Sequence, residues 1–491
     1  MENNKNNEAN SLNNAVKIRN NIKSILYKFV SKIISNIAII IPMVIFLKEW
    51  SFITISLMII FDLIYIFLSW INEYILLLDN EARYHYGIFS KNTMIIPKKN
   101  IKSMDISISI LERILRYSSV KIESPVKGAD LDQIKLYLSN KDIDKLKNFA
   151  FNSGCNEESI NKEYITLDEN GKEDVNRLEN VYVKKVKTKE LFKYGITSFN
   201  IIIIIVVIMK GYSVLENIII DGTINDLISS STVYLTERFN LVMGIAGIIV
   251  LIILLKIMAI IYYIIKYYDF TILKDGDNIK VKYGLINSRE FSFDCNNVKN
   301  VKLKANIFRQ IIKSYEMTVN VKGYNDSRNE KIIIYPIGTE AELFNILKEI
   351  LPKFAIEGSG EGIKKGKVML VLKPLIIIIL ISFIAYFIFK TPYVFLLNLL
   401  LVFTIPNSIL KGKNLNLKIE KDKIKAVSGG FLKIKYLLDK KDIQAVKFIT
   451  TPFLKKYNLG KISICFYSEI GDEINLNYMN ENKIPYIIKK K

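Results

Sequence analysis

Histidine is almost absent from this chain: His85 is the only one among 491 residues, and there are only three cysteines, Cys155, Cys295 and Cys465. A zinc site built on several histidines is therefore excluded, as is any Ser-His-Asp or Cys-His arrangement that does not use His85. His85 lies in the segment YHYG beside a turn, where a half-exposed strand residue is the simpler interpretation. The cysteines are isolated and lack CxxC spacing, so we interpret them as small apolar residues.

Phosphate-binding motifs are also missing. The chain has no GxxxxGK[ST] sequence, and its glycine-rich stretch, residues 358–362, follows a predicted helix and precedes an apolar segment. A phosphate-binding loop instead joins a strand to a helix. Adjacent carboxylates such as Glu157 and Glu158 fall in a polar linker, where we expect them to be solvated. The sequence therefore predicts a protein that is not an enzyme and that has no cofactor and no metal site.

Long apolar segments are what the chain has instead, with 50% hydrophobic and 24% charged residues overall. A segment of about 19 residues forms a helix of roughly 28 Å, which matches the core of a bilayer. A buried helix of a soluble protein is the alternative for one segment, but it is a poor explanation for six that come in pairs. The six predicted transmembrane helices cover residues 29–47, 52–70, 194–209, 241–264, 368–389 and 392–410.

Each pair of apolar segments precedes one copy of a repeat. A turn glycine is followed at 14, 14 and 13 residues by an apolar residue, and ten residues later by another. Short apolar runs between turn residues indicate strands, and the segments ILERILRY and IFRQIIKS indicate a short helical insert. Spacing kept in three places predicts three copies of one β-rich module. The residues that define the repeat are Gly87, Ile101 and Leu111; Gly284, Val298 and Phe308; and Gly430, Ile443 and Phe453.

The predicted fold is an integral membrane α+β protein with six transmembrane helices in three hairpins, each followed by a β module. Amphipathic helices are expected to close the first two modules. The predicted segments are a disordered N-terminus (1–25), hairpin 1 (26–71), module 1 (72–152), a charged linker (153–191), hairpin 2 (192–266), module 2 (267–354), a Gly-rich linker (355–367), hairpin 3 (368–411) and module 3 (412–491).

Basic residues adjoin one end of every hairpin. Lys23 and Lys28 precede the first hairpin, Lys187 and Lys189 precede the second, and the turns on the far side are poor in lysine. By the positive-inside rule, both termini and all three modules face the cytoplasm, and the chain is a multi-pass protein of the plasma membrane. The cysteines then lie on the reducing side, so we expect no disulfide.

The hairpin-then-module repeat, the G-[IL]-[FI] turn and the insert of the SILERILRY type resemble the bacterial membrane pleckstrin-homology (PH) proteins of the YdbS/YdbT group. Three copies look like the longer, YdbT-like members, as does the segment KTKELFKYGITS. The resemblance implies PH-like barrels, each closed by a C-terminal helix. The third copy departs from the pattern, because Pro452 replaces the isoleucine of the insert and Pro485 weakens the closing helix.

The same resemblance implies a non-enzymatic scaffold or adaptor. Such a protein would act with a smaller membrane PH-domain protein, or by self-association, in envelope homeostasis or tolerance of membrane-active compounds. A transporter or lipid-moving channel is the alternative function. It requires polar residues between the transmembrane helices, and these are few: Asn36, Asp62, Asn200, Lys256 and Asn398.

The net charge of +21 might suggest nucleic acid, but the excess lies beside the apolar segments and on the modules. Anionic lipid is the nearest partner there, and each basic residue near that surface is worth about 1 kcal/mol. Orienting the hairpins accounts for part of the excess. We therefore expect no nucleic-acid partner, and the candidates for headgroup contact are Lys98, Lys99, Lys102, Lys299, Lys302 and Lys304.

Asp62 and Lys256 are charges inside apolar segments, at similar depth. A charge at a helix centre costs roughly 2.5–3.5 kcal/mol on insertion scales, so such residues usually find a partner in the bundle. One interpretation is that Asp62 and Lys256 pair and tie hairpin 1 to hairpin 2. The alternative is that Lys256 extends to the interface and a protonated Asp62 makes a helix contact.

The predicted orientation can be checked with single cysteines in a chain whose native cysteines are replaced. Ser229→Cys, between the third and fourth apolar segments, should react with an impermeant thiol reagent in intact cells because that turn lies outside. Ser468→Cys should react only after the cells are opened. Labelling of Ser468→Cys in intact cells would overturn the orientation.

Overall fold

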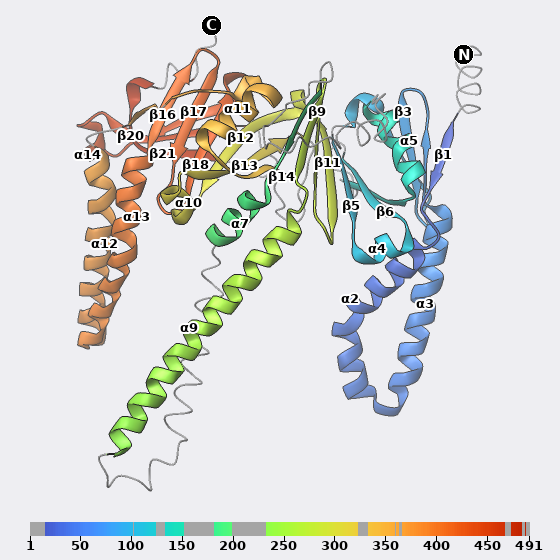
Figure 1. Cartoon of the computed structure of the whole chain (residues 1–491), viewed down its shortest axis with the longest axis horizontal. Helices are drawn as coiled ribbons and strands as arrows, with labels where there is room; N and C mark the ends of the chain where they lie inside the picture. Colours follow the sequence, from blue (N-terminus) through green and yellow to red (C-terminus); the bar gives the residue numbers. More distant parts are fainter. Residues whose placement is uncertain are drawn as a thin grey trace, which may run out of the picture.

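The structure is a computed structural model of the chain, with the β-rich parts in a row and the apolar helices extending to one side of it (Figure 1). This arrangement agrees with modules that share one face of a membrane. The described residues are 15–101, 103–123, 133–151, 181–198, 232–322, 332–358, 360–362, 366–466, 473–483 and 487.

Module 1 consists of an antiparallel four-stranded sheet, three further strands and a closing helix. Side chains at alternate positions of the strands point into one core. Ile75 and Tyr84 come from the four-stranded sheet, Met104 and Ile106 come from the further strands, and Leu146 comes from the closing helix. The elements are β1 (Val16–Arg19), β2 (Tyr74–Leu77), β3 (Glu81–Tyr86), β4 (Asn92–Pro97), β5 (Ser103–Ile108), α4 (Ile110–Leu115), β6 (Ser118–Glu123), β7 (Gln133–Leu138) and α5 (Asn140–Phe151).

Module 2 repeats this order around its own core, which contains Phe270, Phe293 and Tyr335. Its strands before the insert are β8 (Val181–Lys185), β9 (Thr271–Asp275), β10 (Asn278–Tyr283), β11 (Ser288–Asp294) and β12 (Val298–Ala305). They are followed by α10 (Ile307–Ile311), β13 (Ser314–Val321), β14 (Ile332–Thr339) and α11 (Glu340–Ile350).

Module 3 keeps the strands but has a shorter insert. Pro452 occupies the first turn of α14 (Pro452–Lys455), where its missing N–H costs nothing, so the departure from the repeat pattern shortens the helix without removing it. The closing helix expected after Asn482 falls mostly outside the described residues. The strands are β15 (Glu361–Gly362), β16 (Asn416–Glu420), β17 (Lys423–Ser428), β18 (Lys433–Asp439), β19 (Ile443–Ile449), β20 (Leu459–Phe466) and β21 (Glu473–Asn480).

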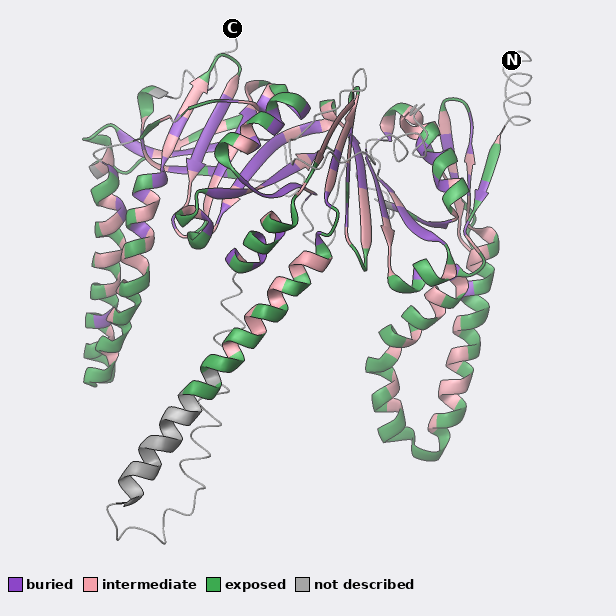
Figure 2. Ribbon diagram, in the orientation of Figure 1, coloured by how far each residue is buried: buried purple, intermediate pink, exposed green. Residues whose placement is uncertain are grey.

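The apolar helices expose their side chains along most of their length (Figure 2). Phe46 is 81% exposed and Phe52 is 79% exposed, as expected for surfaces that face lipid rather than water. Four described stretches are long and apolar enough to cross a membrane: the α2–α3 hairpin (Ser24–Asn72), Ile249–Lys266 of α9 (Thr232–Lys266), α12 (Gly366–Phe389) and Pro392–Asn414. The last begins as a 3-10 helix and continues as α13 (Leu401–Asn414). The third expected segment lies largely outside the described residues.

Each module also takes a strand from before its hairpin. Residues 1–25 were expected to be disordered, but Val16–Arg19 forms β1 and pairs with β2 in the register Val16↔Leu77. The charged linker supplies β8, and the Gly-rich linker supplies β15, which pairs with β16. The physical reason is that the first strand after each hairpin has an unpaired edge that a neighbouring segment can satisfy.

The sheets continue from one module into the next. Strand β5 of module 1 pairs with β11 of module 2 from Ser103↔Phe293 to Ile108↔Ser288, so seven strands from two modules form one sheet. In the same way, β12 of module 2 pairs with β18 of module 3 from Asn300↔Leu438 to Ala305↔Lys433. The family resemblance implied a PH-like barrel after each hairpin. The strands at both joints instead pair with the neighbouring module.

The turn glycine of module 3 is Gly429 rather than Gly430. Gly87, Gly284 and Gly429 have φ values of 102°, 109° and 100°, whereas Gly430 does not have a positive φ. With Gly429, the spacing to Ile443 becomes 14 residues, as in the other two copies. Two glycines stand side by side at this turn, and residue spacing alone does not specify which of them has the positive φ.

The turn conformation predicts a large cost for a side chain at Gly284. A Cβ there would overlap the carbonyl oxygen of Asn287, and the positive φ adds strain. Gly284→Ala should lower the free energy of unfolding by about 3 kcal/mol or more. Gly276→Ala is the control, because Gly276 also has a positive φ but nothing lies within 4 Å of the added Cβ. It should cost about 1–2 kcal/mol. Equal losses in detergent-solubilised protein would contradict the overlap.

Candidate functional site

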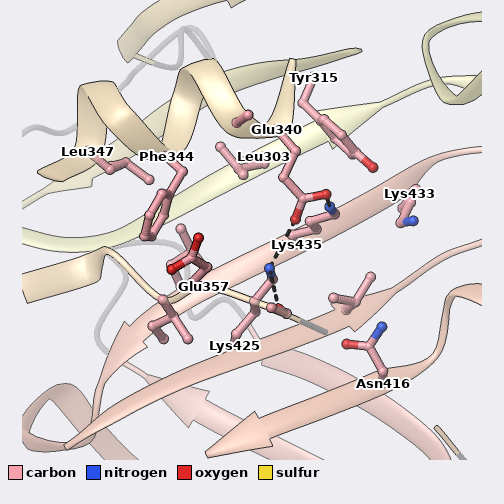
Figure 3. A pocket seen from close by; sticks show the side chains of 15 residues that line it. Leu303, Tyr315, Glu340, Phe344, Leu347, Glu357, Asn416, Lys425, Lys433 and Lys435 are labelled. Atoms are coloured by element: carbon pink, nitrogen blue, oxygen red, sulfur yellow. Dashed lines mark hydrogen bonds and ion pairs between the residues drawn. The ribbon is translucent and has the colours of Figure 1, made fainter. Parts of the chain in front are cut away.

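A hollow with charged walls lies at the joint between modules 2 and 3. It has a volume of about 490 Å³ and is formed by helix α11 on one side and strands β17 and β18 on the other (Figure 3). Glu340 and Phe344 of α11 face Lys425 and Lys435 of these strands. We call it the joint cleft.

Glu340 at the N-terminus of α11 binds two buried lysines of the next module. Lys435 Nζ lies 2.6 Å and Lys425 Nζ 3.0 Å from its carboxylate oxygens. Burial favours the neutral carboxyl, yet the hydrogen bonds and charges of Lys435 and Lys425 lower the pKa of Glu340 to about 2. Burial lowers the pKa of Lys435, and the Glu340 carboxylate opposes this. The charges of the cleft therefore stabilise the joint.

A matching ion pair of opposite polarity lies at the joint between modules 1 and 2. Lys147 of α5 is 2.8 Å from Glu290 of β11, and both side chains are largely buried. They line a smaller hollow of about 270 Å³ in the corresponding place. Glu290 and Lys435 each stand six residues after the turn glycine of their module. The polarity is opposite at the two joints. If module 1 paired with module 3 in place of module 2, Lys147 would therefore face Lys435, and the two like charges would oppose that pairing.

The insert helices make a second contact across each joint. Arg113 of α4 donates from Nη1 to the carbonyl oxygen of Leu285, 2.9 Å away. Gln310 of α10 donates from Nε2 to the carbonyl oxygens of Gly430 at 2.8 Å and Phe431 at 3.1 Å. In both cases, a side chain of one module binds the turn that follows the glycine of the next.

The chemistry that the cleft offers is binding and joining. Lysine ammonium groups and the carboxylates of Glu340 and Glu357 supply no nucleophile with an adjacent general base. Within the residues described above, no group of three or more histidine, cysteine, aspartate or glutamate side chains could hold a metal ion. Lys433, on the rim with Tyr315, is the cleft lysine that makes no ion pair with Glu340 in the structure.

A buried polar cluster, which the sequence analysis missed, ties module 2 to its membrane helices. Arg309 of α10 is 2.8 Å from Glu316 and lies over the ring of Tyr194, 4.2 Å from its centroid. Tyr194 belongs to helix α7 (Thr188–Thr197), and its hydroxyl donates to the same Glu316 carboxylate. Tyr194 lies far from Arg309 in the sequence, and Glu316 lies on the next strand, β13, whereas the surrounding sequence IFRQIIKS predicts only the helical period.

The structure does not bring Asp62 and Lys256 together. Asn36 Nδ2 donates to Asp62 Oδ2 at 2.8 Å inside hairpin 1. Lys256 Nζ donates to the carbonyl oxygens of Ser198 at 2.6 Å and Gly195 at 3.3 Å, at the end of α7. The predicted pair between hairpins is therefore wrong. Each charge is satisfied locally, which avoids the cost of bringing two separate hairpins into contact.

The structure describes five of the six lysines that were expected to face headgroups. Lys98 and Lys99 are in the turn between β4 and β5, at the end of these strands opposite to the Gly87 turn. Lys299 pairs with Asp442 at 2.6 Å across the second joint. The expectation is wrong for Lys302, which is 8% exposed and lies near the rings of Tyr436 and Phe466. Lys304 pairs through its backbone with Ile434 of the joint strand β18, and Lys102 lies outside the described residues.

The repeat-defining residues lie either in a core or on the surface of an insert helix. Ile101 and Val298 are buried where the second sheet begins, and Ile443 packs partly against the third core. Leu111 is 50% exposed and Phe308 is 41% exposed on the insert helices, so they do not form part of a core. The side chain of Phe453 is outside the described set.

The ion pairs at the second joint predict the effect of Glu340→Gln. Removal of the carboxylate leaves Lys425 and Lys435 buried without this charge partner. We expect a loss of about 1–2 kcal/mol in the free energy of unfolding, below the roughly 3–5 kcal/mol of a fully buried pair, because Glu340 is half exposed. Glu357→Gln, on the same cleft, is the control and should be nearly neutral.

The same pair predicts a pH dependence. The pKa of Glu340 lies below its ordinary value of 4.5, so its stabilising contribution is complete above pH 4.5 and disappears as the pH falls towards 2. The difference in unfolding midpoint between the native chain and Glu340→Gln should shrink over that interval. A constant difference would show that the charge does not cause it.

Comparisons with known proteins agree with this architecture. The sequence model of the bacterial PH domain family matches residues 32–149, 221–351 and 367–490. The UPF0699 transmembrane protein YdbT of Bacillus subtilis (strain 168) is 21% identical over 423 residues, which cover 84% of this chain and 83% of that protein. No solved structure matches the chain. The three family matches cover most of the sequence, and each includes one module. This chain is therefore a membrane protein of the bacterial PH-domain family, in the group that includes YdbT.

Proposed function

We propose that this protein is a non-enzymatic membrane scaffold, which holds three PH-like modules in a fixed row on the cytoplasmic leaflet. The observation that carries the proposal is the pairing of β5 with β11 and of β12 with β18. Shared sheets make a rigid platform out of modules that would otherwise move independently. In the role that the resemblance to the YdbS/YdbT group implies, the platform serves envelope homeostasis or tolerance of membrane-active compounds.

Lipid contact in this proposal comes from the base of the modules. The Gly284 turn is bonded to the end of α9, since Leu285 N donates to the carbonyl oxygen of Ile265, so the turns and insert helices lie beside the membrane helices. At this base Phe89 is 97% exposed, Ile114 70% and Ile311 73%, with Arg113 and Arg116 nearby. Apolar side chains flanked by arginine suit the boundary between headgroups and acyl chains.

The alternative, a path for lipid or solute through the hairpins, has less support. Asn36 and Asp62 are bonded to each other in hairpin 1, and Ser382 donates to Asn398 in hairpin 3 at 3.3 Å. Among the described helices, these polar groups are therefore satisfied within single hairpins rather than placed along a common channel.

Reconstitution into liposomes tests the proposal. The purified chain should leave the exchange of a fluorescent lipid between leaflets at the rate of protein-free vesicles, because a scaffold needs no path through the bilayer. Ile114→Glu combined with Ile311→Glu should leave the hairpins inserted but release the modules from the surface, measured as faster proteolysis of the module row. Lipid exchange well above background would instead favour the channel, and unchanged proteolysis would remove the lipid contact.

A further inference from the structure

Two strand edges of this chain are equivalent in the repeat to the strands that pair at the joints between its modules. Of the strands described, β4 pairs only with β3, and β19 pairs only with β20. Their counterparts are the joint strands: β4 corresponds to β11 and β18, and β19 corresponds to β5 and β12. Module 1 therefore presents one half of a joint, and module 3 presents the other half.

Burial distinguishes these free edges from their paired counterparts. Ile95 of β4 is 53% exposed, while the residues at the same position in modules 2 and 3, Ser292 and Leu437, are each 2% exposed. Leu437 packs into the core of the preceding module. On β19, Val446 is only partly buried, whereas its counterpart Val301 is fully buried. The two edges thus expose the side chains that the internal joints cover.

The insert helices also differ between the internal joints and the end of the chain. Arg113, Gln310 and Lys455 each stand 26 residues after the turn glycine of their module. Arg113 and Gln310 bind the turn of the following module, whereas Lys455 of α14 is exposed. At the other end of the chain, the Gly87 turn has no insert helix on it among the described residues, and Phe89 in that turn is 97% exposed.

We propose that the β19 edge and α14 of one chain dock onto the β4 edge and the Gly87 turn of a second copy of this chain. The inference rests on the scaffold function proposed above and specifies its partner. Both halves of the joint occur on one chain, and the internal joints show how they fit. The contact is head to tail, and repeated contacts extend the row of modules in the plane of the membrane with all hairpins on one side (Figure 1).

The internal joints also give the register. Met104 pairs with Ser292 at the first joint, and Val301 pairs with Leu437 at the second, at the same distances from their turn glycines. The equivalent pair between two chains is Val446 with Ile95. The next pair along the strands is Lys447 with Met94. Residues directly opposite each other in an antiparallel pair have Cα atoms about 4.5–5.5 Å apart, within reach of a disulfide.

Cysteine crosslinking between two differently tagged chains tests the contact. Both chains have serine in place of Cys155, Cys295 and Cys465; one carries Ile95→Cys and the other Val446→Cys. Oxidation of membranes from cells that produce both should give a disulfide-linked heterodimer. Chains with only one of the two cysteines should not crosslink to themselves. In the control, Thr450→Cys takes the place of Val446→Cys and is combined with Ile95→Cys. Residue 450 is four positions from the expected partner of residue 95, so this pair should crosslink little.

Substitutions at Ile95 provide an independent readout through the Met94→Cys and Lys447→Cys pair. Ile95→Asp should reduce that crosslink by about tenfold or more, because a carboxylate would be desolvated in the joint. Ile95→Ser is the matched control, because serine occupies this position in the buried joint between modules 1 and 2. It should retain most of the crosslink.

Several results would overturn the proposal. Self-crosslinking of Ile95→Cys or Val446→Cys alone would show a symmetric contact, and equal yields for Val446→Cys and Thr450→Cys would show no defined register. Absence of the heterodimer, or its replacement by a link to a different protein such as a smaller PH-type membrane protein, would exclude a second copy as the occupant. The scaffold function would survive each of these results. The scaffold function is tested separately by the measurement of lipid exchange in liposomes, and that measurement does not depend on the contact between chains.

Discussion

Strand pairing between modules is the interaction on which the rest of this structure depends. An unpaired strand edge presents a row of backbone donors and acceptors, and here that row is satisfied by the neighbouring module at two places. Side chains alternate along the shared strands, so Phe291 faces the core of module 2 while the adjacent Ser292 faces module 1. Each joint therefore belongs to two cores at once.

The membrane helices and the joints constrain each other. The Gly284 turn is bonded to the end of α9, and the insert helices bind the glycine turn of the next module through Arg113 and Gln310. Arg309 and Glu316 connect the base of module 2 to α7, whose Tyr194 packs against Tyr263 of α9. The place of each module relative to its helices and to the next module is thus set by neighbouring contacts.

Charge gives each joint its identity. Strand pairing alone is nearly independent of sequence, and three similar modules could pair in more than one order. The Lys147–Glu290 pair at one joint and the Glu340–Lys435 pair at the other have opposite polarity at the same repeat position. A wrong pairing would bury unpaired or like charges, which costs more than the correct pair contributes.

The sequence by itself determined the membrane helices, the repeated β module, the insert helices and the absence of catalytic motifs. These features follow from local composition and spacing: apolar length, the glycine turns and the three- and four-residue period of segments such as ILERILRY. Most of the third apolar segment and the third closing helix lie outside the described residues and remain predictions.

Tertiary structure alone decided which strands pair, which glycine forms the third turn and where the charges find partners. Strand β1 lies before hairpin 1 and pairs with β2 after it, because an open sheet edge accepts any extended segment within reach. Gly429 and Gly430 are adjacent, and only backbone conformation separates them. Asp62 and Lys256 matched in depth and charge, but partners within reach, Asn36 and the end of α7, satisfied each of them first.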